Sequence, residues 1–163
     1  MRILGVDPGL GRLGWGVIEA ESNKQKAISY GCIETPTGMS DEKRLLIIYK
    51  ALKELIKTYQ PEVVAVEELF FSRNVTTAFM VGQARGVILL AAAESGLSVA
   101  THAPSQVKLA VTGYGNAEKK QIAQMVKVIL KLEKIPKLDD TTDALAVALA
   151  QAFSSKMGLK LKQ

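Results

Sequence analysis

Acidic residues stand at three places in this 163-residue sequence where an apolar core pattern would not place them. One ends the apolar run RILGVD, two end the valine-rich run EVVAVEE, and three lie just before the apolar run ALAVALA. Carboxylate oxygens are the ligands that hard divalent cations prefer. Two such ions about 4 Å apart can activate a water molecule and stabilise the leaving oxygen in phosphodiester cleavage. The residues concerned are Asp7, Glu67, Glu68, Asp139, Asp140 and Asp143.

Each of these acids also has a purely structural explanation. An aspartate followed by Pro-Gly, as at Asp7, is typical of a turn. Asp139 and Asp140 suit the first turn of a helix, where they can cap the chain and meet the positive end of the helix dipole. Asp143 lies one turn further on, beside an apolar stripe, where capping does not require an acid. The combination therefore favours a metal site over several unrelated structural roles.

The pattern of apolar residues predicts one α/β domain that would position these acids. Three strand-like runs are expected to form an antiparallel meander, and a fourth, nearly all valine and alanine, has the composition of a buried parallel strand. The predicted strands, with a short fifth one, are Arg2–Asp7, Gly14–Glu21, Gln25–Glu34, Glu62–Glu67 and Leu97–Thr101. Helical spacing predicts helices, the first capped by Ser40 and the fourth by Asn116, at Asp41–Tyr59, Asn74–Ser95, Pro104–Thr112, Ala117–Leu132 and Asp139–Ser155. The expected fold is a five-stranded mixed sheet flanked by helices.

This arrangement would bring the acids together. If the first and fourth strands are parallel neighbours, Asp7 and Glu67 lie at the edge where open α/β sheets place their sites. Asp140 and Asp143 are three residues apart and share a helix face. Strand geometry alone leaves Glu67 and Glu68 as alternatives, because neighbouring residues point to opposite faces. Carboxylates gathered in this way would repel each other unless a cation lay among them.

Composition limits the other possibilities. With 48% apolar and 23% charged residues the chain has a globular composition, and its net charge of +5 favours an anionic partner such as nucleic acid. Single cysteine and histidine residues, Cys32 and His102, exclude an internal disulfide and a metal site built from several such residues. The apolar stretch 76–93 carries Gln83 and Arg85, and the N-terminus lacks a signal-peptide pattern. We therefore expect a cytoplasmic protein without a membrane span.

Five segments resemble the RuvC family of bacterial Holliday junction resolvases, within the RNase H-like superfamily. They occur in the family's order and are GVDPGLGRLGWGVI, VAVEELFFSRN, GQARGVILLAA, PSQVKLAVTGYGNAEKKQI and DDTTDALAVALA. The resemblance implies an RNase H-like nuclease domain at 1–155, with a basic and flexible tail at 156–163. It further implies a structure-selective endodeoxyribonuclease that resolves four-way DNA junctions by paired symmetric nicks in recombination and repair.

The resemblance also implies a metal site. Asp7, Glu67, Asp140 and Asp143 match the family's metal-binding acids, which selects the first of the two adjacent glutamates. Some relatives carry histidine at the position of Asp140. The implied cofactor is Mg²⁺, with Mn²⁺ also supporting activity and two ions in each site. We expect the glycines after Asp7, Gly9 among them, to leave room for an approaching DNA backbone.

Further matching residues are expected to contact DNA. Lys108 and Lys119 match lysines near the scissile bond, where they would position phosphate, although each is also an ordinary solvated helix charge. Phe70 matches an aromatic residue placed against junction bases, and from the residues alone either Phe70 or Phe71 could stack there. Arg85 could bind DNA or be paired across a dimer interface. The expected DNA contacts are Phe70, Arg73, Asn74, Arg85, Lys108, Tyr114, Lys119 and Lys120.

Family members are homodimers, paired largely through the helix that here spans Asn74–Ser95, and they cooperate with the RuvA–RuvB branch-migration complex. Three alternatives compete with a resolvase. A D-x-G after the first strand also opens actin-type and sugar-kinase domains, but those need a second lobe for which 163 residues leave no room. A non-catalytic nucleic-acid-binding module would be weakened by acids on its phosphate-binding surface. A general RNase H or a YqgF-type RNA nuclease would share the acids, and Phe70 with the region of Lys108 and Lys119 favours the resolvase over it.

Overall fold

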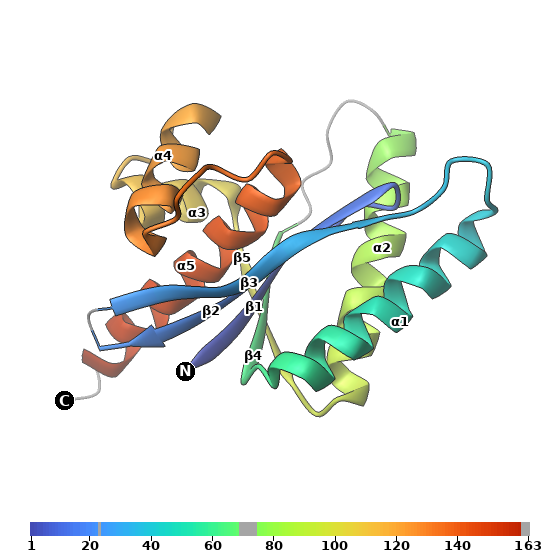
Figure 1. The fold of residues 1–163 in the computed structure, drawn as a ribbon, viewed down its shortest axis with the longest axis horizontal. Coiled ribbons are helices and arrows are strands. Elements are labelled where there is room, and N and C mark those ends of the chain that lie inside the picture. Colours follow the sequence, from blue (N-terminus) through green and yellow to red (C-terminus); the bar gives the residue numbers. More distant parts are fainter. Residues whose placement is uncertain (23, 69–74, 161–163) are drawn as a thin grey trace.

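The computed structural model describes residues 1–22, 24–68 and 75–160. Its strands are β1 (Arg2–Asp7), β2 (Arg12–Glu21), β3 (Lys24–Glu34), β4 (Val63–Glu67) and β5 (Ser98–His102). They form one sheet in the order β3-β2-β1-β4-β5 (Figure 1). The pairs β1–β2 and β2–β3 are antiparallel, whereas β1–β4 and β4–β5 are parallel. The predicted meander and the predicted parallel neighbours are therefore confirmed.

Helices cover both faces of this sheet, which makes a three-layer domain (Figure 1). The helices of the described segments are α1 (Asp41–Tyr59), α2 (Val75–Glu94), α3 (Pro104–Thr112), α4 (Lys119–Leu130) and α5 (Asp139–Lys160). α1 and α2 pack on one face, and α3, α4 and α5 pack on the other. α5 runs across the middle of its face, so the N-terminal end of that helix reaches the sheet edge where β1 and β4 end.

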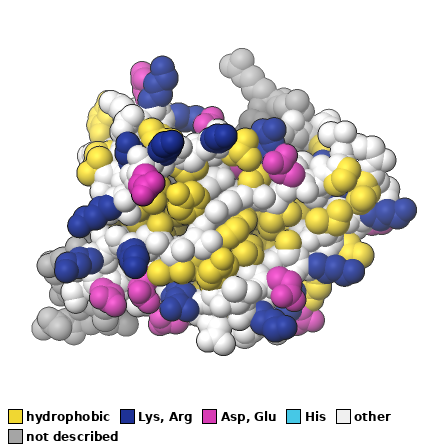
Figure 2. Space-filling view, in the orientation of Figure 1, with side chains coloured by type: hydrophobic (Ala, Val, Ile, Leu, Met, Phe, Trp, Pro, Cys, Tyr) yellow, Lys and Arg dark blue, Asp and Glu magenta, His cyan; other side chains and the backbone are white. Residues whose placement is uncertain are grey.

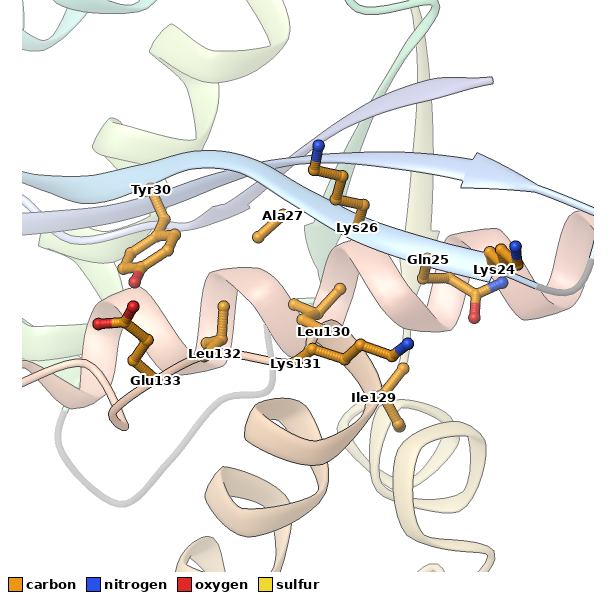
Figure 3. Close-up of a pocket in the computed structure, with 10 residues that line it drawn as sticks. All are labelled: Lys24, Gln25, Lys26, Ala27, Tyr30, Ile129, Leu130, Lys131, Leu132 and Glu133. Atoms are coloured by element: carbon orange, nitrogen blue, oxygen red, sulfur yellow. The ribbon is translucent and has the colours of Figure 1, made fainter.

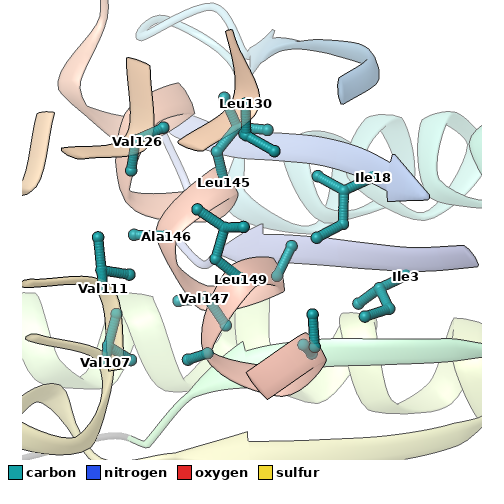
Figure 4. Close-up of a cluster of buried hydrophobic side chains, with 14 of the residues drawn as sticks. Ile3, Ile18, Val107, Val111, Val126, Leu130, Leu145, Ala146, Val147 and Leu149 are labelled. Carbon is teal, nitrogen blue, oxygen red and sulfur yellow. The ribbon is translucent and has the colours of Figure 1, made fainter. Parts of the chain in front are cut away.

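Alternating residues of the central strands supply two separate apolar cores. Ile3 and Ala65 pack toward α3, α4 and α5, where Figure 4 shows Leu145 and Leu149 of α5 in the same cluster. The neighbouring Leu4 packs with α1 and α2 on the opposite face. This period of two is what a strand buried on both faces requires. It also fixes the face on which every later residue of β1 and β4 lies.

Some helix ends and caps differ from the predicted ones. α4 begins at Lys119, and its N-cap residue is Glu118, whose N–H donates to the Gln121 side-chain oxygen at 2.8 Å. The prediction that Asn116 caps this helix, with Ala117 as its first residue, is therefore wrong. The side chain that accepts a hydrogen bond from the N-cap N–H is that of Gln121, in the first turn of the helix. Ser40 does stand at the N-cap of α1, but its hydroxyl donates to Glu42 and makes no cap bond. α5 continues to Lys160, beyond the predicted end at Ser155.

α2 is more apolar than its burial in the domain requires. By length and composition alone, the segment Thr76–Glu94 could cross a membrane, with 28% of that window buried inside the domain. A helix in a protein core passes the same test, so one such segment is weak support for a membrane span. Phe79 and Leu90 leave 67% and 60% of their surface exposed, whereas Ala84 and Ile88 lie in the core. α2 thus has one face in the domain and one apolar face without a partner in the described chain.

Candidate active site

Two of the predicted acids lie side by side at the ends of parallel strands. Val6 pairs with Val66 in the parallel ladder, so the next residue of each strand, Asp7 and Glu67, follows at the same level. Gly5 of β1 and Ala65 of β4 face α5. Asp7 and Glu67 each come two positions later in their strands, so strand alternation turns their side chains to the same face. The exposed Glu68 is the next residue after β4, and its N–H donates to the His102 carbonyl at 2.8 Å. The side chain that faces α5 is therefore that of Glu67.

Glycines bring the start of α5 close to these strand ends. Gly14 is the ladder partner of Asp7, and a Cβ atom at Gly14 would lie 1.9 Å from the carbonyl oxygen of Asp140. A Cβ at Gly5 would lie 2.1 Å from the carbonyl oxygen of Ala144. Both distances are far inside van der Waals contact, so only glycine permits this approach. The close packing sets the first turns of α5, with Asp140 and Asp143, beside Asp7.

Electrostatics show that the acids act on each other. Burial, followed by the charges of Asp143, Asp140 and Glu67, raises the pKa of Asp7 from 3.8 to about 7, and Lys119 opposes this rise. Burial and the charge of Asp143 also raise the pKa of Glu67. Asp7 therefore holds its proton to a much higher pH than an ordinary aspartate does. The cluster carries more negative charge than the protein around it neutralises.

Two predicted lysines lie at this cluster. The Lys119 ammonium is 3.4 Å from Oδ2 of Asp143, and this carboxylate raises the pKa of Lys119. Burial raises the pKa of Asp143, and the same lysine opposes that rise. The positive charges of Lys119 and Lys108 both act to lower the pKa of Glu67. A pocket of about 210 Å³ is lined by these two lysines together with Glu67 and Asp143, so cationic and anionic groups face one small cavity.

The donor set suits a hard divalent cation, because it consists of carboxylate oxygens with excess negative charge. Within the described residues, however, no three acidic, histidine or cysteine side chains stand ready as a metal cage. The Lys119 ammonium instead lies against Asp143 and neutralises part of the charge. The residues fit such an ion in chemistry and in location.

The other predicted DNA contacts lie elsewhere or outside the described residues. Phe70, Arg73 and Asn74, together with Phe71, belong to the segment that the structure leaves undescribed. Tyr114 and Lys120 line a separate hollow of about 450 Å³ between α3 and α4. Arg85 lies on α2, where its Nη2 is 3.4 Å from the Thr101 hydroxyl. The structure thus does not place Arg85, Tyr114 or Lys120 in the pocket lined by the carboxylates.

Sequence reasoning missed a buried arginine that holds the turn after Asp7. Arg44 is 8% exposed, and its Nε donates to the Thr35 hydroxyl at 2.9 Å. That hydroxyl donates in turn to the Leu10 carbonyl at 2.6 Å. A signal was present, because Arg44 stands four residues before Ile48, on the stripe of α1 that faces the core. The buried Arg44 guanidinium and Thr35 together hold the backbone at Leu10, in the turn that follows Asp7.

Gly9 has a local role in the same turn. A Cβ atom there would lie 2.2 Å from the carbonyl oxygen of Arg12, so a side chain would collide with the turn itself. The structure therefore supplies a reason for this glycine within the chain, where the sequence had suggested room for a DNA backbone.

Comparisons with known proteins agree with this geometry. The family model of the crossover junction endodeoxyribonuclease RuvC matches residues 3–151. The RuvC protein of Heliobacterium modesticaldum is 58% identical over 159 residues, which cover 98% of each chain. That of Caldanaerobacter subterraneus is 51% identical over 157 residues, 96% of this chain and 95% of the other.

Solved structures show the same likeness in three dimensions. The structure of Thermus thermophilus RuvC in complex with a Holliday junction substrate is 38% identical, with a TM-score of 0.92 over 97% of this chain and 96% of that one. The yeast mitochondrial Holliday junction resolvase is only 11% identical and shares the fold, with a TM-score of 0.70 over 97% of this chain and 82% of that one. The strand order, the acids at its edge and these matches lead to one conclusion: the chain belongs to the RuvC family of crossover junction endodeoxyribonucleases.

Proposed function

We propose that the chain resolves four-way DNA junctions by hydrolysing phosphodiester bonds at the site of Asp7, Glu67, Asp140 and Asp143. One observation carries the proposal: burial, together with the charges of acids from the ends of two strands and the start of α5, raises the pKa of Asp7 to about 7. Such mutual repulsion lowers the stability of the protein, and a structural role would not need it. A bound cation would turn the same arrangement into a favourable one.

The family to which the chain belongs depends on divalent metal ions. For this chain the proposed cofactor is Mg²⁺, with Mn²⁺ also supporting activity and two ions held by the four carboxylates. When bound, such ions supply the Lewis acidity that activates water and stabilises the leaving 3′ oxygen. Asp7 must give up the proton that it holds near neutral pH before its carboxylate can serve as a ligand.

The lysines provide positive charge on the other side of the small pocket. Lys119 already pairs with Asp143 and is otherwise open to solvent, so its ammonium can also meet a phosphoryl oxygen as charge develops there. Lys108 lines the same pocket and acts on Glu67. We assign both lysines to orienting the scissile phosphate and offsetting its negative charge. A further DNA contact is proposed from the family resemblance for Phe70. From residue type and position, DNA contacts are also proposed for Arg73, Asn74, Tyr114 and Lys120, and Arg85 is proposed to contact either DNA or the dimer partner.

We further propose a homodimer that pairs through α2. The exposed apolar face with Phe79 and Leu90 supports this, because contiguous exposed apolar surface marks interaction sites. Along the same helix Gly82 and Gly86 have open space where a side chain would be, so a second helix could approach closely. Arg85 in the middle of the helix argues against a membrane span. Two nicks in one junction require two sites, which a dimer supplies.

By the same family resemblance, the proposed partner of this dimer is the RuvA–RuvB branch-migration complex, in the cytoplasm. A structure-selective nuclease of this kind acts where branch migration presents a junction. The remaining division of the chain, with a nuclease domain at 1–155 and a flexible tail at 156–163, stays a prediction.

A cleavage assay on three substrates tests the proposed function. The protein is incubated with Mg²⁺ and a synthetic four-way junction, the matching linear duplex, or an RNA–DNA hybrid. We expect paired symmetric nicks in the junction and no comparable cleavage of the other two. Preferred cleavage of the hybrid would instead indicate a general RNase H, and binding without cleavage of any substrate would indicate a non-catalytic module.

A further inference from the structure

A second pocket lies beside the edge strand β3. It has a volume of about 640 Å³ and lies between β3 and the segment where α4 ends. Lys26 of β3 pairs with Glu19, which pairs with Arg2, so this part of the pocket is level with the start of β1. Asp7 lies five residues further along β1, or about 17 Å at the rise of an extended strand. The end of the pocket at Tyr30 is nearer, because the carbonyl of the next residue, Gly31, accepts a hydrogen bond from the Thr141 hydroxyl at 3.1 Å. The pocket nevertheless shares no lining residue with the pocket of Glu67 and Asp143.

The wall of this pocket is largely apolar. Figure 3 shows Ala27 of β3 facing Leu130 and Leu132 across the space between the strand and the end of α4. Tyr30, with 40% of its surface exposed, lies at one end of the pocket near Glu133. Ala27 and Tyr30 lie on the same face although three residues apart, because the ladder shifts register opposite Val17 and Ile18. The bulge thus places both Ala27 and Tyr30 on the side of β3 that lines the pocket.

Lysines outnumber carboxylates among the lining residues, although the ladder partners of Lys24 and Lys26 on β2 are Glu21 and Glu19, and Figure 3 shows the Lys26 side chain pointing away from Leu130. The lining includes three lysines, Lys24, Lys26 and Lys131, against the one carboxylate of Glu133. Figure 3 shows the amino groups of Lys24 and Lys131 toward the end of the pocket opposite to Tyr30. In Figure 2 hydrophobic side chains gather beside the backbone of β3, with both basic and acidic side chains around them. An occupant with an apolar centre and negative charge at one end would match both features.

β3 supplies a third feature. It is the outermost strand of the sheet, and on its outer side no strand of the described segments pairs with it. Such an edge presents free backbone N–H and C=O groups to which an extended peptide can add as a further strand. Lysines on an edge strand also discourage pairing with other cationic or neutral strands. An acidic strand would meet no such barrier.

We propose that this pocket and the β3 edge are a docking surface for an extended acidic segment of a partner protein. The apolar side chains of the segment would lie against Ala27 and Leu132, and its carboxylates would lie beside Lys24 and Lys131. The tail of the chain itself does not fit, because its sequence KMGLKLKQ carries lysines and no acid. DNA fits less well than a peptide, since an apolar floor offers phosphates nothing and the site lies away from the acids that would cleave.

Titration of the full-length protein with short synthetic peptides tests this proposal. The probe is an acetylated, amidated peptide with a Leu-Val centre flanked by aspartates, and backbone amide shifts of ¹⁵N-labelled protein report binding. We expect saturable shifts confined to β3 and residues 129–133. The matched peptide with lysines for aspartates, and the one with serines for the apolar residues, should bind at least about tenfold more weakly.

Charge reversal gives a second readout. The double variant Lys24→Glu, Lys131→Glu should lose at least about tenfold in peptide affinity while it cleaves the four-way junction at the unchanged rate. The control variant Lys50→Glu, Lys57→Glu, on exposed positions of α1, should keep both properties. Junction cleavage by the double variant also shows that it folds.

Four outcomes would overturn the proposal. One is the absence of shifts with the acidic peptide, and another is equal binding of the lysine peptide. The third is that a short DNA duplex displaces the peptide from the β3 amides, and the fourth is that the double variant loses junction cleavage, because in either case the surface would belong to the DNA-binding face. The first three outcomes do not depend on whether the carboxylates are the active site, so this proposal and the proposed function can fail independently.

Discussion

Replacing Asp7 with asparagine should make the metal-free protein more stable, and the gain should grow with pH. Asp7 is largely buried, and the charges of Asp143, Asp140 and Glu67 disfavour its ionised form. Asparagine has nearly the same shape and carries no charge. The variant therefore removes a repulsion from the folded state while it keeps the packing of the strand end.

The magnitude follows from proton binding. The pKa of Asp7 is 3.8 in an unperturbed chain and about 7 in the folded protein, so the folded state binds more protons between these values. Stability then falls as pH rises through this window. The ionisation penalty is about 1.5 kcal/mol at pH 5 and about 4 kcal/mol at pH 8. The advantage of asparagine should accordingly increase by about 2–3 kcal/mol between pH 5 and pH 8.

Urea unfolding followed by circular dichroism, in buffer with a chelator, measures this difference. The control is Glu68→Gln. It removes an exposed carboxylate next to Glu67 in the sequence, and it should change stability by less than about 0.5 kcal/mol. Addition of Mg²⁺ at pH 8 should raise the free energy of unfolding of the wild type more than that of Asp7→Asn. A difference between Asp7→Asn and wild type that stays constant from pH 5 to pH 8 would refute the reasoning.

Three further variants probe the frame around the site. Gly14→Ala should lower stability by about 3 kcal/mol or more and reduce junction cleavage, since its Cβ would collide with the carbonyl of Asp140, whereas Gly38→Ala, with nothing within 4 Å, should be neutral in urea unfolding. Arg44→Ala should cost about 2–4 kcal/mol in the same assay, because it leaves the Thr35 network without its buried donor; a loss below 0.5 kcal/mol would contradict this. Phe79→Asp should shift analytical ultracentrifugation from dimer to monomer, and an unchanged dimer would exclude α2 as the interface.

Most of the sheet could be predicted from the sequence, because strand patterns repeat every two residues and leave a clear signal. The run VVAVE at 63–67 is apolar on both faces, and it is indeed flanked by β1 and β5 with helices above and below. The predicted start of α4 was wrong, since Ala117 and Asn116 look like a helix beginning as well as Glu118 does. The deciding contact is the reach of Gln121 back to the Glu118 N–H, which a local pattern does not reveal.

The acidic residues of the site could be predicted from the sequence, whereas the packing contacts that hold them in place could not. Asp7 and Glu67 could be placed together because parallel strands end at one edge. The close approach of α5 over Gly14, and the buried contact of Arg44 with Thr35, depend on residues far apart in the sequence. Tertiary packing decides such contacts, and a single sequence carries little trace of it. The salt bridge of Lys119 with Asp143 belongs to the same class.

Single-turnover cleavage of a four-way junction by Asp7→Asn, measured beside junction binding, tests the central claim most directly. If the acids form the metal site, the variant should bind the junction with wild-type affinity and cleave it on the order of a thousandfold more slowly with Mg²⁺ present. Glu68→Gln, one residue from the proposed ligand Glu67, should cleave normally. Unchanged cleavage by Asp7→Asn would contradict the assignment of this site.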